Sequence, residues 1–469
     1  MQQGFAKEVL QRLPLAEAVL RSLQWICEPR SLDALFEDVG QPCYTDTLTF
    51  ALLVSLISDA LLEHGGSARK SFERAKERDE LPVSVQAAYQ KLGNLPLAVS
   101  EAFLADSTKR LAEVFPPGLR AIELPASLKE FALVVVDGKA VKRVPKRLKP
   151  LRGRPGGVLG GKAAVALELA TGLALAMATD VDGETNESKL LGALLPQVRQ
   201  QRQNILWIAD SQFCDPTQIH EFMARPGDHF LVRYSAKNRF FRDTNRPVSS
   251  GTDSRGRPYT EEWGWLGIER NKHRRYVRRI TLERPGEETV ILVTDLLDEK
   301  QHPAIDLLET YLQRWGIERV FQIITEVFSL DHLIGTTPKG TLFQLAFCLL
   351  LYNLIQLVRA YIAQGGGEKV SSVSSELLFD DVRRQLIALH EVLTPPQVVP
   401  LLVPMPTASE LQKRLQTLLH SLWKERWRKS PPRKRAEPHP ERKNRHHNSV
   451  HRIVQAYRSE KKQESGSSQ

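Results

Sequence analysis

A short apolar run that ends in an acidic residue constrains the fold more than any other stretch of this chain. Phe131–Lys139 reads FALVVVDGK, and its apolar residues run directly into Asp137. A Val-rich run closed by a turn signal is typical of a strand buried on both faces of a sheet. Asp-Gly is also a common hairpin turn, which is the simpler interpretation of Asp137-Gly138 taken alone. A strand in mid-sheet would instead hold Asp137 on a rigid base.

A second apolar run of the same kind ends in Asp210. Residues 204–209 read NILWIA, and the helix that follows has its own N-cap, Asp215, with Pro216 at the first helical position. Asp210 is therefore not needed as a cap, which favours a chemical role. If the two strands are parallel neighbours, their ends lie about 4.8 Å apart. The carboxyl ends of strands are where α/β sheets bind ligands.

The segments around these two runs predict an α/β fold. They indicate a hairpin turning at Thr171-Gly172 within 164–180, a helix over 190–199 and a strand over 229–235. This order predicts a mixed sheet with helices packed on it, formed by residues 126–235.

Residues 236–300 have a different pattern and predict an antiparallel β insertion. Turn-forming residues alternate there with β-rich stretches, which carry Trp263 and Trp265 among several arginines. Aromatic side chains can stack on unpaired bases, and arginines can hold phosphates. The alternative is that the tryptophans belong to the core and the arginines to a solvated face.

Helical periodicity dominates both ends of the chain. Residues 1–125 are expected to form a helical domain, which is either a helix-turn-helix-like DNA reader or an ordinary helical domain. A second part of the core would follow over 301–345, and a helical region over 346–428. The apolar stretch 342–358 contains three amide side chains, so a buried helix is favoured and no membrane association is expected. Residues 429–469 are rich in Arg, Lys, His and Pro, which predicts a disordered basic tail.

The charge of the chain points to an anionic partner. The 469 residues carry a net charge of +10, and nucleic acid is the first candidate for such a protein. A basic loop over 139–162, which contains Lys139, Lys142 and Arg143, directly follows Asp137. Positive charge beside a catalytic carboxylate suits a phosphodiester substrate, although the loop is also typical of a mobile surface segment.

The four cysteines are scattered without a CxxC pair, which argues against a zinc site or a disulfide framework. Scattered cysteines and an N-terminus unlike a signal peptide favour a cytoplasmic protein.

A third carboxylate lies on a predicted helix over Ala304–Phe328. Tyr311, Arg314 and Glu318 recur there at i, i+3 and i+7, so one helix would present them on one face. This face could bring Glu318 close to Asp137 and Asp210. The alternative is an exposed Arg–Glu pair of a common kind.

Asp137, Asp210 and Glu318, in this order, resemble the catalytic set of the DDE transposases of bacterial insertion sequences. The resemblance covers about 130–345 and is to the family-four-like subgroup, which has a ribonuclease-H-like core and a β insertion before the final Glu. Tyr311-x2-Arg314-x3-Glu318 looks like that subgroup's Tyr-Arg-Glu-Lys signature. Thr325 stands where the signature has Lys, so the phosphate contact of that lysine is missing or supplied elsewhere.

The resemblance implies a cut-and-paste DNA transposase. Such an enzyme binds the terminal inverted repeats of its element on double-stranded DNA and joins the freed 3′ ends to target DNA. It acts as a homodimer in a synaptic complex, here in the cytoplasm at the nucleoid. The three carboxylates would hold two Mg²⁺ ions, for which Mn²⁺ can substitute, with Asp137 bridging. Tyr311 and Arg314 would face the DNA backbone. Two alternatives remain open, namely an inactivated or nuclease-only relative and a non-catalytic DNA-binding protein.

Overall fold

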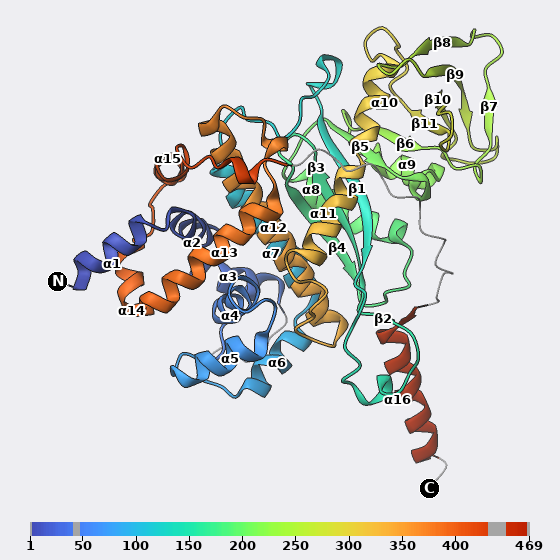
Figure 1. Cartoon of the computed structure of the whole chain (residues 1–469). Coiled ribbons are helices and arrows are strands. Elements are labelled where there is room, and N and C mark those ends of the chain that lie inside the picture. The colour runs from blue at the N-terminus through green and yellow to red at the C-terminus, as the bar shows by residue number, and fades with distance from the viewer. Residues whose placement is uncertain (1, 41–46, 430–446, 467–469) are drawn as a thin grey trace.

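A ten-stranded mixed sheet runs through the computed structural model, which describes residues 2–40, 47–429 and 447–466 (Figure 1). The strand order is β4-β3-β1-β5-β6-β11-β10-β9-β7, and β8 pairs with β9. The strands of this sheet are β1 (Ala132–Ala140), β3 (Lys162–Glu168), β4 (Ala174–Asp180), β5 (Ile205–Ala209), β6 (His229–Arg233), β7 (Phe240–Arg242), β8 (Ser249–Thr252), β9 (Pro258–Leu266), β10 (Arg275–Leu282) and β11 (Val290–Thr294).

The first half of the sheet has the predicted ribonuclease-H-like order. Strands β1, β3 and β4 are antiparallel neighbours, and β5 and β6 add to β1 in parallel. The hairpin between β3 and β4 turns at Thr171-Gly172, as expected, and Gly172 has the positive φ that favours glycine there. Val134, Val135 and Val136 are fully buried, so β1 is the mid-sheet strand that its sequence predicts. The mixed α/β fold with flanking helices is therefore confirmed.

The β insertion extends this sheet instead of forming a separate one. Strand β11 pairs antiparallel with β6, and β10, β9 and β7 follow outward in antiparallel order. Without the insertion, β6 would be an edge strand with unpaired backbone N–H and C=O groups, and pairing with β11 satisfies these groups. Figure 1 shows the insertion as a lobe at the end of the sheet away from β4.

Helices cover both faces of the core sheet. Helix α8 packs against β3 and β4, whereas α7 and α12 also contact β4 and α11 lies against β1. The helices are α1 (Gln2–Gln11), α2 (Pro14–Ile26), α3 (Pro29–Val39), α4 (Phe50–Leu62), α5 (Ala68–Glu77), α6 (Val85–Asn94), α7 (Leu97–Glu113), α8 (Leu191–Arg199), α9 (Pro216–Phe222), α10 (Ala304–Leu312), α11 (Trp315–Glu326), α12 (Pro338–Gly366), α13 (Ser375–Val392), α14 (Pro395–Val398), α15 (Ala408–Leu419) and α16 (Val450–Gly466).

Helix α12 is the central support of the helical layer. By length and composition it could cross a membrane, but its apolar window is wholly buried inside the protein, which confirms the predicted buried helix. Its amide side chains have partners: Asn353 Oδ1 accepts a hydrogen bond from Ala174 N at 2.8 Å, and Gln344 Oε1 accepts one from Ile334 N at 2.8 Å. The helix runs without interruption across the division expected between residues 345 and 346.

The helices from the two ends of the chain pack together. Helix α2 contacts both α13 and α15, and Figure 1 shows these elements side by side. The Glu17 carboxylate, 1% exposed, accepts hydrogen bonds from Arg21 Nε at 2.7 Å and Arg414 Nε at 2.9 Å. The predicted regions 1–125 and 346–428 therefore share one packed helical body.

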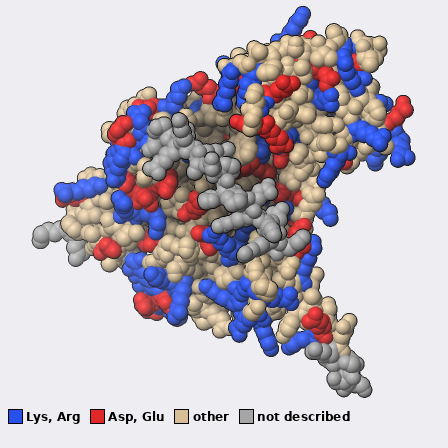
Figure 2. Space-filling view, turned by 45° about the vertical axis from the view of Figure 1, so that its right-hand side comes forward, with Lys and Arg blue, Asp and Glu red and all other residues tan. Residues whose placement is uncertain are grey.

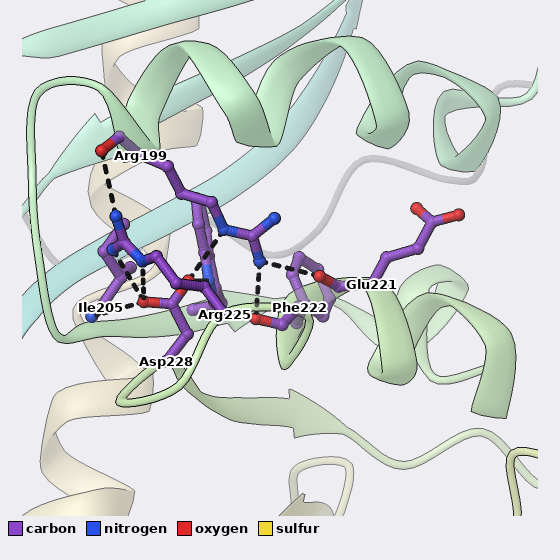
Figure 3. Close-up of polar contacts among 7 residues, drawn as sticks. Arg199, Ile205, Glu221, Phe222, Arg225 and Asp228 are labelled. Carbon is purple, nitrogen blue, oxygen red and sulfur yellow. Dashed lines mark hydrogen bonds and ion pairs between the residues drawn. The ribbon is translucent and has the colours of Figure 1, made fainter.

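A buried carboxylate fixes the start of β5 (Figure 3). Asp228, 3% exposed, accepts hydrogen bonds from Arg199 Nε at 2.8 Å, Arg225 Nη2 at 2.8 Å and Ile205 N at 3.2 Å. Arg199 also donates to the carbonyls of Glu221 and Phe222, at the end of α9. These contacts tie the end of α8, the end of α9 and the first residue of β5 together, and so set the position of Asp210 at the other end of β5.

The predicted disorder of the whole tail 429–469 is wrong for residues 450–466, which form helix α16. Residues 430–446 lie outside the described residues. Strand β12 (Asn448–Ser449) pairs with β2 (Val158–Leu159), and Arg452 Nε lies 2.8 Å from Asp182 Oδ2. Val450, 1% exposed, is buried against the fold. The apolar residues of this short segment find partners only in the folded protein, so composition alone underestimates its order.

Candidate active site

The two aspartates lie side by side at the ends of parallel strands. In the register of β1 and β5, Val136 pairs with Ala209, so Asp137 and Asp210 are the next residues on neighbouring strands. The two strands are therefore parallel neighbours, the arrangement under which the sequence placed the two aspartates close together. Asp215 caps α9 by accepting a hydrogen bond from Thr217 N at 2.9 Å, and the Asp210 side chain makes no capping bond. The Asp210 carboxylate thus remains available for chemistry.

Glu318 reaches the site from a helix that is broken. The prediction of one continuous helix over 304–328 is wrong, because α10 ends at Leu312 and α11 begins at Trp315. Between them, Arg314 N bonds to Tyr311 O at 2.9 Å, a tight i to i−3 contact. Gly316 in the first turn of α11 also has a low helix propensity. Tyr311, Arg314 and Glu318 therefore converge from two helices and the turn that joins them.

Arg314 joins two of the carboxylates and Tyr311 contacts the third. Arg314 is 5% exposed, and its Nη1 lies 3.4 Å from Asp137 Oδ2 while its Nη2 lies 3.1 Å from Glu318 Oε1. The Tyr311 hydroxyl donates to Asp210 Oδ1 at 3.5 Å. Burial raises the pKa of Tyr311 well above its usual range, so its phenol remains a hydrogen-bond donor. The structure thus brings the three predicted acids and the two signature side chains into one cluster.

The electrostatics of Asp137 are those of a carboxylate in a crowded acidic site. Burial, with smaller contributions from Glu187 and Glu318, raises the pKa of Asp137 to about 6, although Arg314 and the Gly138 N–H oppose this shift. A positive group near Asp137 therefore stabilises its charged form. Arg314 supplies that positive charge in this structure.

The cluster fits a hard divalent cation in its donor chemistry. Carboxylate oxygens are the ligands that Mg²⁺ and Mn²⁺ prefer, and Asp137 and Glu318 are already gathered around one cation, the Arg314 guanidinium. Within the described ranges, no group of three or more His, Cys, Asp or Glu side chains is yet arranged to hold a metal ion. An ion held by Asp137, Asp210 and Glu318 would have to take over contacts that Arg314 now makes.

Glu187 is a fourth acidic residue at this site that the sequence did not identify. Its carboxylate lies 2.7 Å from Lys162 Nζ on β3 and accepts a hydrogen bond from Gln212, two residues after Asp210. A Cβ on Gly138 would overlap the Glu187 carboxyl group. Glu187 therefore links the segments that follow both aspartates. The only sequence signal is the acidic loop 182–189, whose place in the fold depends on long-range packing.

The Gly138→Ala variant is expected to lose about 0.5–1.5 kcal/mol of unfolding free energy, because the added methyl group must displace the end of the Glu187 side chain from Lys162 and Gln212. Gly138 lies in extended β1 and has no positive φ, so backbone strain does not contribute. Chemical denaturation measures the change. In the Glu187→Ala background the same substitution should have little effect. As a control, Gly192→Ala on helix α8, with open space at the position of its Cβ, should not lower stability. An equal loss in both backgrounds would contradict the contact.

Lys139 places an ammonium group beside Thr325. Lys139 Nζ on β1 donates to Thr325 Oγ1 at 3.0 Å and to Phe321 O at 3.3 Å, both on α11. Thr325, which stands where the signature has Lys, therefore contacts the ammonium group of a lysine on β1.

Lys142 and Arg143 are exposed in the loop that follows β1, and Arg143 Nη1 lies 3.7 Å from Asp331 Oδ2. Figure 2 shows Lys and Arg side chains over much of one face and acidic side chains near its centre.

The two tryptophans of the insertion differ in exposure. Trp263 is 2% exposed, donates to Leu297 O at 3.1 Å and lies under the Arg246 guanidinium at 3.6 Å. Trp265 is 41% exposed, with Arg274 4.8 Å from its ring. In this structure Trp263 belongs to the core, and only Trp265 of the pair offers a ring to a ligand.

Carboxylates at the ends of parallel strands in a ribonuclease-H-like sheet, joined by a glutamate on a helix, define a candidate site for phosphodiester chemistry. Residues 130–354 match the family model described as "Transposase DDE domain", which supports a DDE-type transposase. Among solved structures, the chain is similar to the piggyBac transposase in a synaptic complex with hairpin DNA, at 13% sequence identity and a TM-score of 0.34, over 86% of this chain and 75% of that one. No curated protein matches.

Proposed function

We propose that this chain is a cut-and-paste DNA transposase of the bacterial insertion-sequence type. It would bind the terminal inverted repeats of its own element, cleave the DNA at the element's ends and transfer the freed 3′ ends to target DNA. A synaptic homodimer on two DNA ends, acting at the nucleoid in the cytoplasm, belongs to the same proposal. The single observation that carries it is the cluster of Asp137, Asp210 and Glu318 at the ends of β1 and β5.

The side chains around the carboxylates have distinct tasks in this proposal. Asp137, Asp210 and Glu318 would hold two Mg²⁺ ions, which when bound supply charge stabilisation for an in-line displacement at phosphorus. If bound metal ions took over its contacts with Asp137 and Glu318, the planar guanidinium of Arg314 would be free to bind two oxygens of a phosphate. Tyr311 keeps a hydroxyl donor against Asp210. Exposed Trp265, with Lys142 and Arg143, would contact DNA beyond the scissile phosphate.

The decisive experiment uses a duplex that carries the element's own terminal repeat. Wild type should cleave at the repeat end with Mg²⁺ or Mn²⁺ and not with EDTA, and Glu318→Gln should not cleave. Joining of the cleaved 3′ ends to a target plasmid would distinguish a transposase from a nuclease-only relative. Tight binding with no cleavage under any of these conditions would refute the proposal in favour of a DNA-binding protein.

A reciprocal exchange tests whether Lys139 makes the phosphate contact. Lys139→Thr is expected to weaken binding to the end duplex about tenfold, because one ammonium–phosphate contact is lost. The Lys139→Thr/Thr325→Lys variant restores an ammonium from α11 and should recover most of that affinity. Equilibrium binding in EDTA is the measurement, and Lys369→Thr, which removes an exposed cation away from the carboxylate cluster, is the control. If the exchange variant binds no better than Lys139→Thr, the two positions are not equivalent.

A further inference from the structure

A cavity of about 480 Å³ lies on the side of α11 next to the candidate active site. Its wall includes Trp315 and Arg319 of α11, Gln356 and Arg359 of α12, and Lys429. Arg319 directly follows Glu318 in the chain, so the cavity and the carboxylate cluster lie on adjacent faces of the same helix. None of these five side chains is used in the proposed cleavage site.

Two deeply buried donor groups in this wall lack a partner. Arg359 is 7% exposed; it donates from Nη2 to Val370 O at 2.7 Å and from Nη1 to Gln356 Oε1, but its Nε has no hydrogen-bond partner. Gln356 is 2% exposed, and its Nε2 is likewise unpartnered. Leaving a buried donor unsatisfied costs about 1–3 kcal/mol. Both unpartnered groups are N–H donors, so a ligand that satisfies them must be an acceptor.

The cavity also gathers positive charge without a paired carboxylate. The other buried arginines each contact a carboxylate: Arg21 contacts Glu17, Arg278 contacts Glu261 and Arg314 contacts Asp137. Arg359, Arg319 and Lys429 make no ion pair within the part of the chain that the structure describes. Three acids also line the same wall, namely Glu168, Glu326 and Glu376. Glu168 is paired with Arg202, and none of the three is ion-paired with Arg319, Arg359 or Lys429.

The three cations also repel one another. Lys429 Nζ donates to Ser371 O at 2.7 Å, and this half-buried ammonium has Arg359 and Arg319 as its charged neighbours. Burial, and after it these two arginines, lower the pKa of Lys429 to about 7. Burial likewise lowers the pKa of Arg359 to about 10. An anion in the cavity would relieve the repulsion, and the cavity lies against the side chains that carry the unpartnered donors.

We propose that this cavity is a binding site for a phosphoryl group, formed by Arg319, Arg359, Gln356 and Lys429. Given the proposed function, its ligand is a backbone phosphate of the DNA strand that passes over α11 towards Glu318. Arg319 and Lys429 provide the charge at the opening of the cavity, and Arg359 with Gln356 provides fixed donors at its base. The site would hold the DNA at a phosphate other than the one that is cleaved.

The test uses the full chain with Arg319→Gln/Lys429→Gln and, as a matched control, Lys369→Gln/Arg384→Gln, which removes two cations outside the cavity wall. Binding of a duplex of arbitrary sequence is measured in EDTA over a range of salt concentrations. Melting temperature is measured with inorganic phosphate and with chloride at equal ionic strength. The cavity variant should bind DNA about tenfold more weakly, with a salt slope lower by about 1, since one phosphate is no longer neutralised. Phosphate should raise the melting temperature of wild type and of the control only.

The cavity variant should also melt at a higher temperature than wild type in chloride, because removing two of the three cations relieves their repulsion. A purely structural role for these side chains predicts the opposite. Loss of the phosphate effect with unchanged DNA binding would overturn the DNA assignment and leave free phosphate as the ligand. Unchanged DNA binding with no phosphate effect in wild type would overturn the site altogether. EDTA removes the metal that the proposed cleavage needs, so the binding and melting measurements do not depend on cleavage. They would stand even if the chain proved unable to transpose DNA.

Discussion

Replacing Asp137 with asparagine is expected to lower the rate of metal-dependent DNA cleavage by about 10³-fold, without lowering the stability of the fold. The amide side chain would keep the shape of the carboxylate but remove the charge that the candidate metal site needs. Loss of one preorganised electrostatic contribution in an active site typically costs about 10²–10³-fold, and the proposed metal site would lose one of its three carboxylates. Cleavage of the end duplex at saturating Mg²⁺ measures the effect.

The same substitution should lower the cleavage rate without lowering the free energy of unfolding. The pKa of Asp137 is raised to about 6 in the folded chain, against about 3.9 in an unfolded one. Between these two pH values the folded chain holds the Asp137 proton more tightly than the unfolded chain. The stability that this proton gives is therefore fully present below about pH 4 and is lost as the pH rises from about 4 to 6. At neutral pH the uncharged asparagine removes this penalty, so the denaturation midpoint should not fall. If the variant loses stability and cleavage in proportion, Asp137 has a structural role instead.

Isothermal titration with Mn²⁺ gives an independent readout, in which the variant should bind fewer ions than wild type.

Replacing Asp228 with alanine is expected to destabilise the chain by about 3–5 kcal/mol. Asp228 is the shared acceptor for Arg199, Arg225 and the Ile205 N–H (Figure 3). Removing the shared acceptor is costly because the buried Ile205 N–H and the two partly buried guanidinium groups all lose their partner. Urea denaturation monitored by far-UV circular dichroism measures the change in unfolding free energy.

The control for this prediction is Asp380→Ala, at an exposed position on α13, which should change stability by less than about 0.5 kcal/mol. At a temperature where the Asp228→Ala variant remains folded, its cleavage should still depend on Mg²⁺, since Asp228 sets the start of β5 and does not touch the carboxylate cluster. A loss below about 1 kcal/mol would mean that water replaces the carboxylate and that this cluster does not hold β5.

Local sequence was sufficient for the strands and caps that hold the two aspartates. The Val-rich run before Asp137, the apolar run before Asp210, the turn at Thr171-Gly172 and the Asp215 cap depend on side-chain periodicity and turn chemistry over a few residues. These features are therefore readable without the rest of the chain. The resemblance identified Glu318 from the spacing of the Tyr-Arg-Glu residues. This spacing does not depend on whether the residues lie on one helix, as predicted, or on two, as in the structure.

Tertiary structure decided everything that depends on residues far apart in the chain. The approach of Glu187 to Gly138, the contact of Lys139 with Thr325 and the unpartnered donor of Arg359 are not predictable from local sequence. Each arises where elements separated by tens to hundreds of residues pack, and packing can override the propensity of any one segment. The sequence by itself thus determined which strands carry the acids, and only the folded chain decided which charges surround them, because burial and electrostatic neighbours are properties of the packed whole.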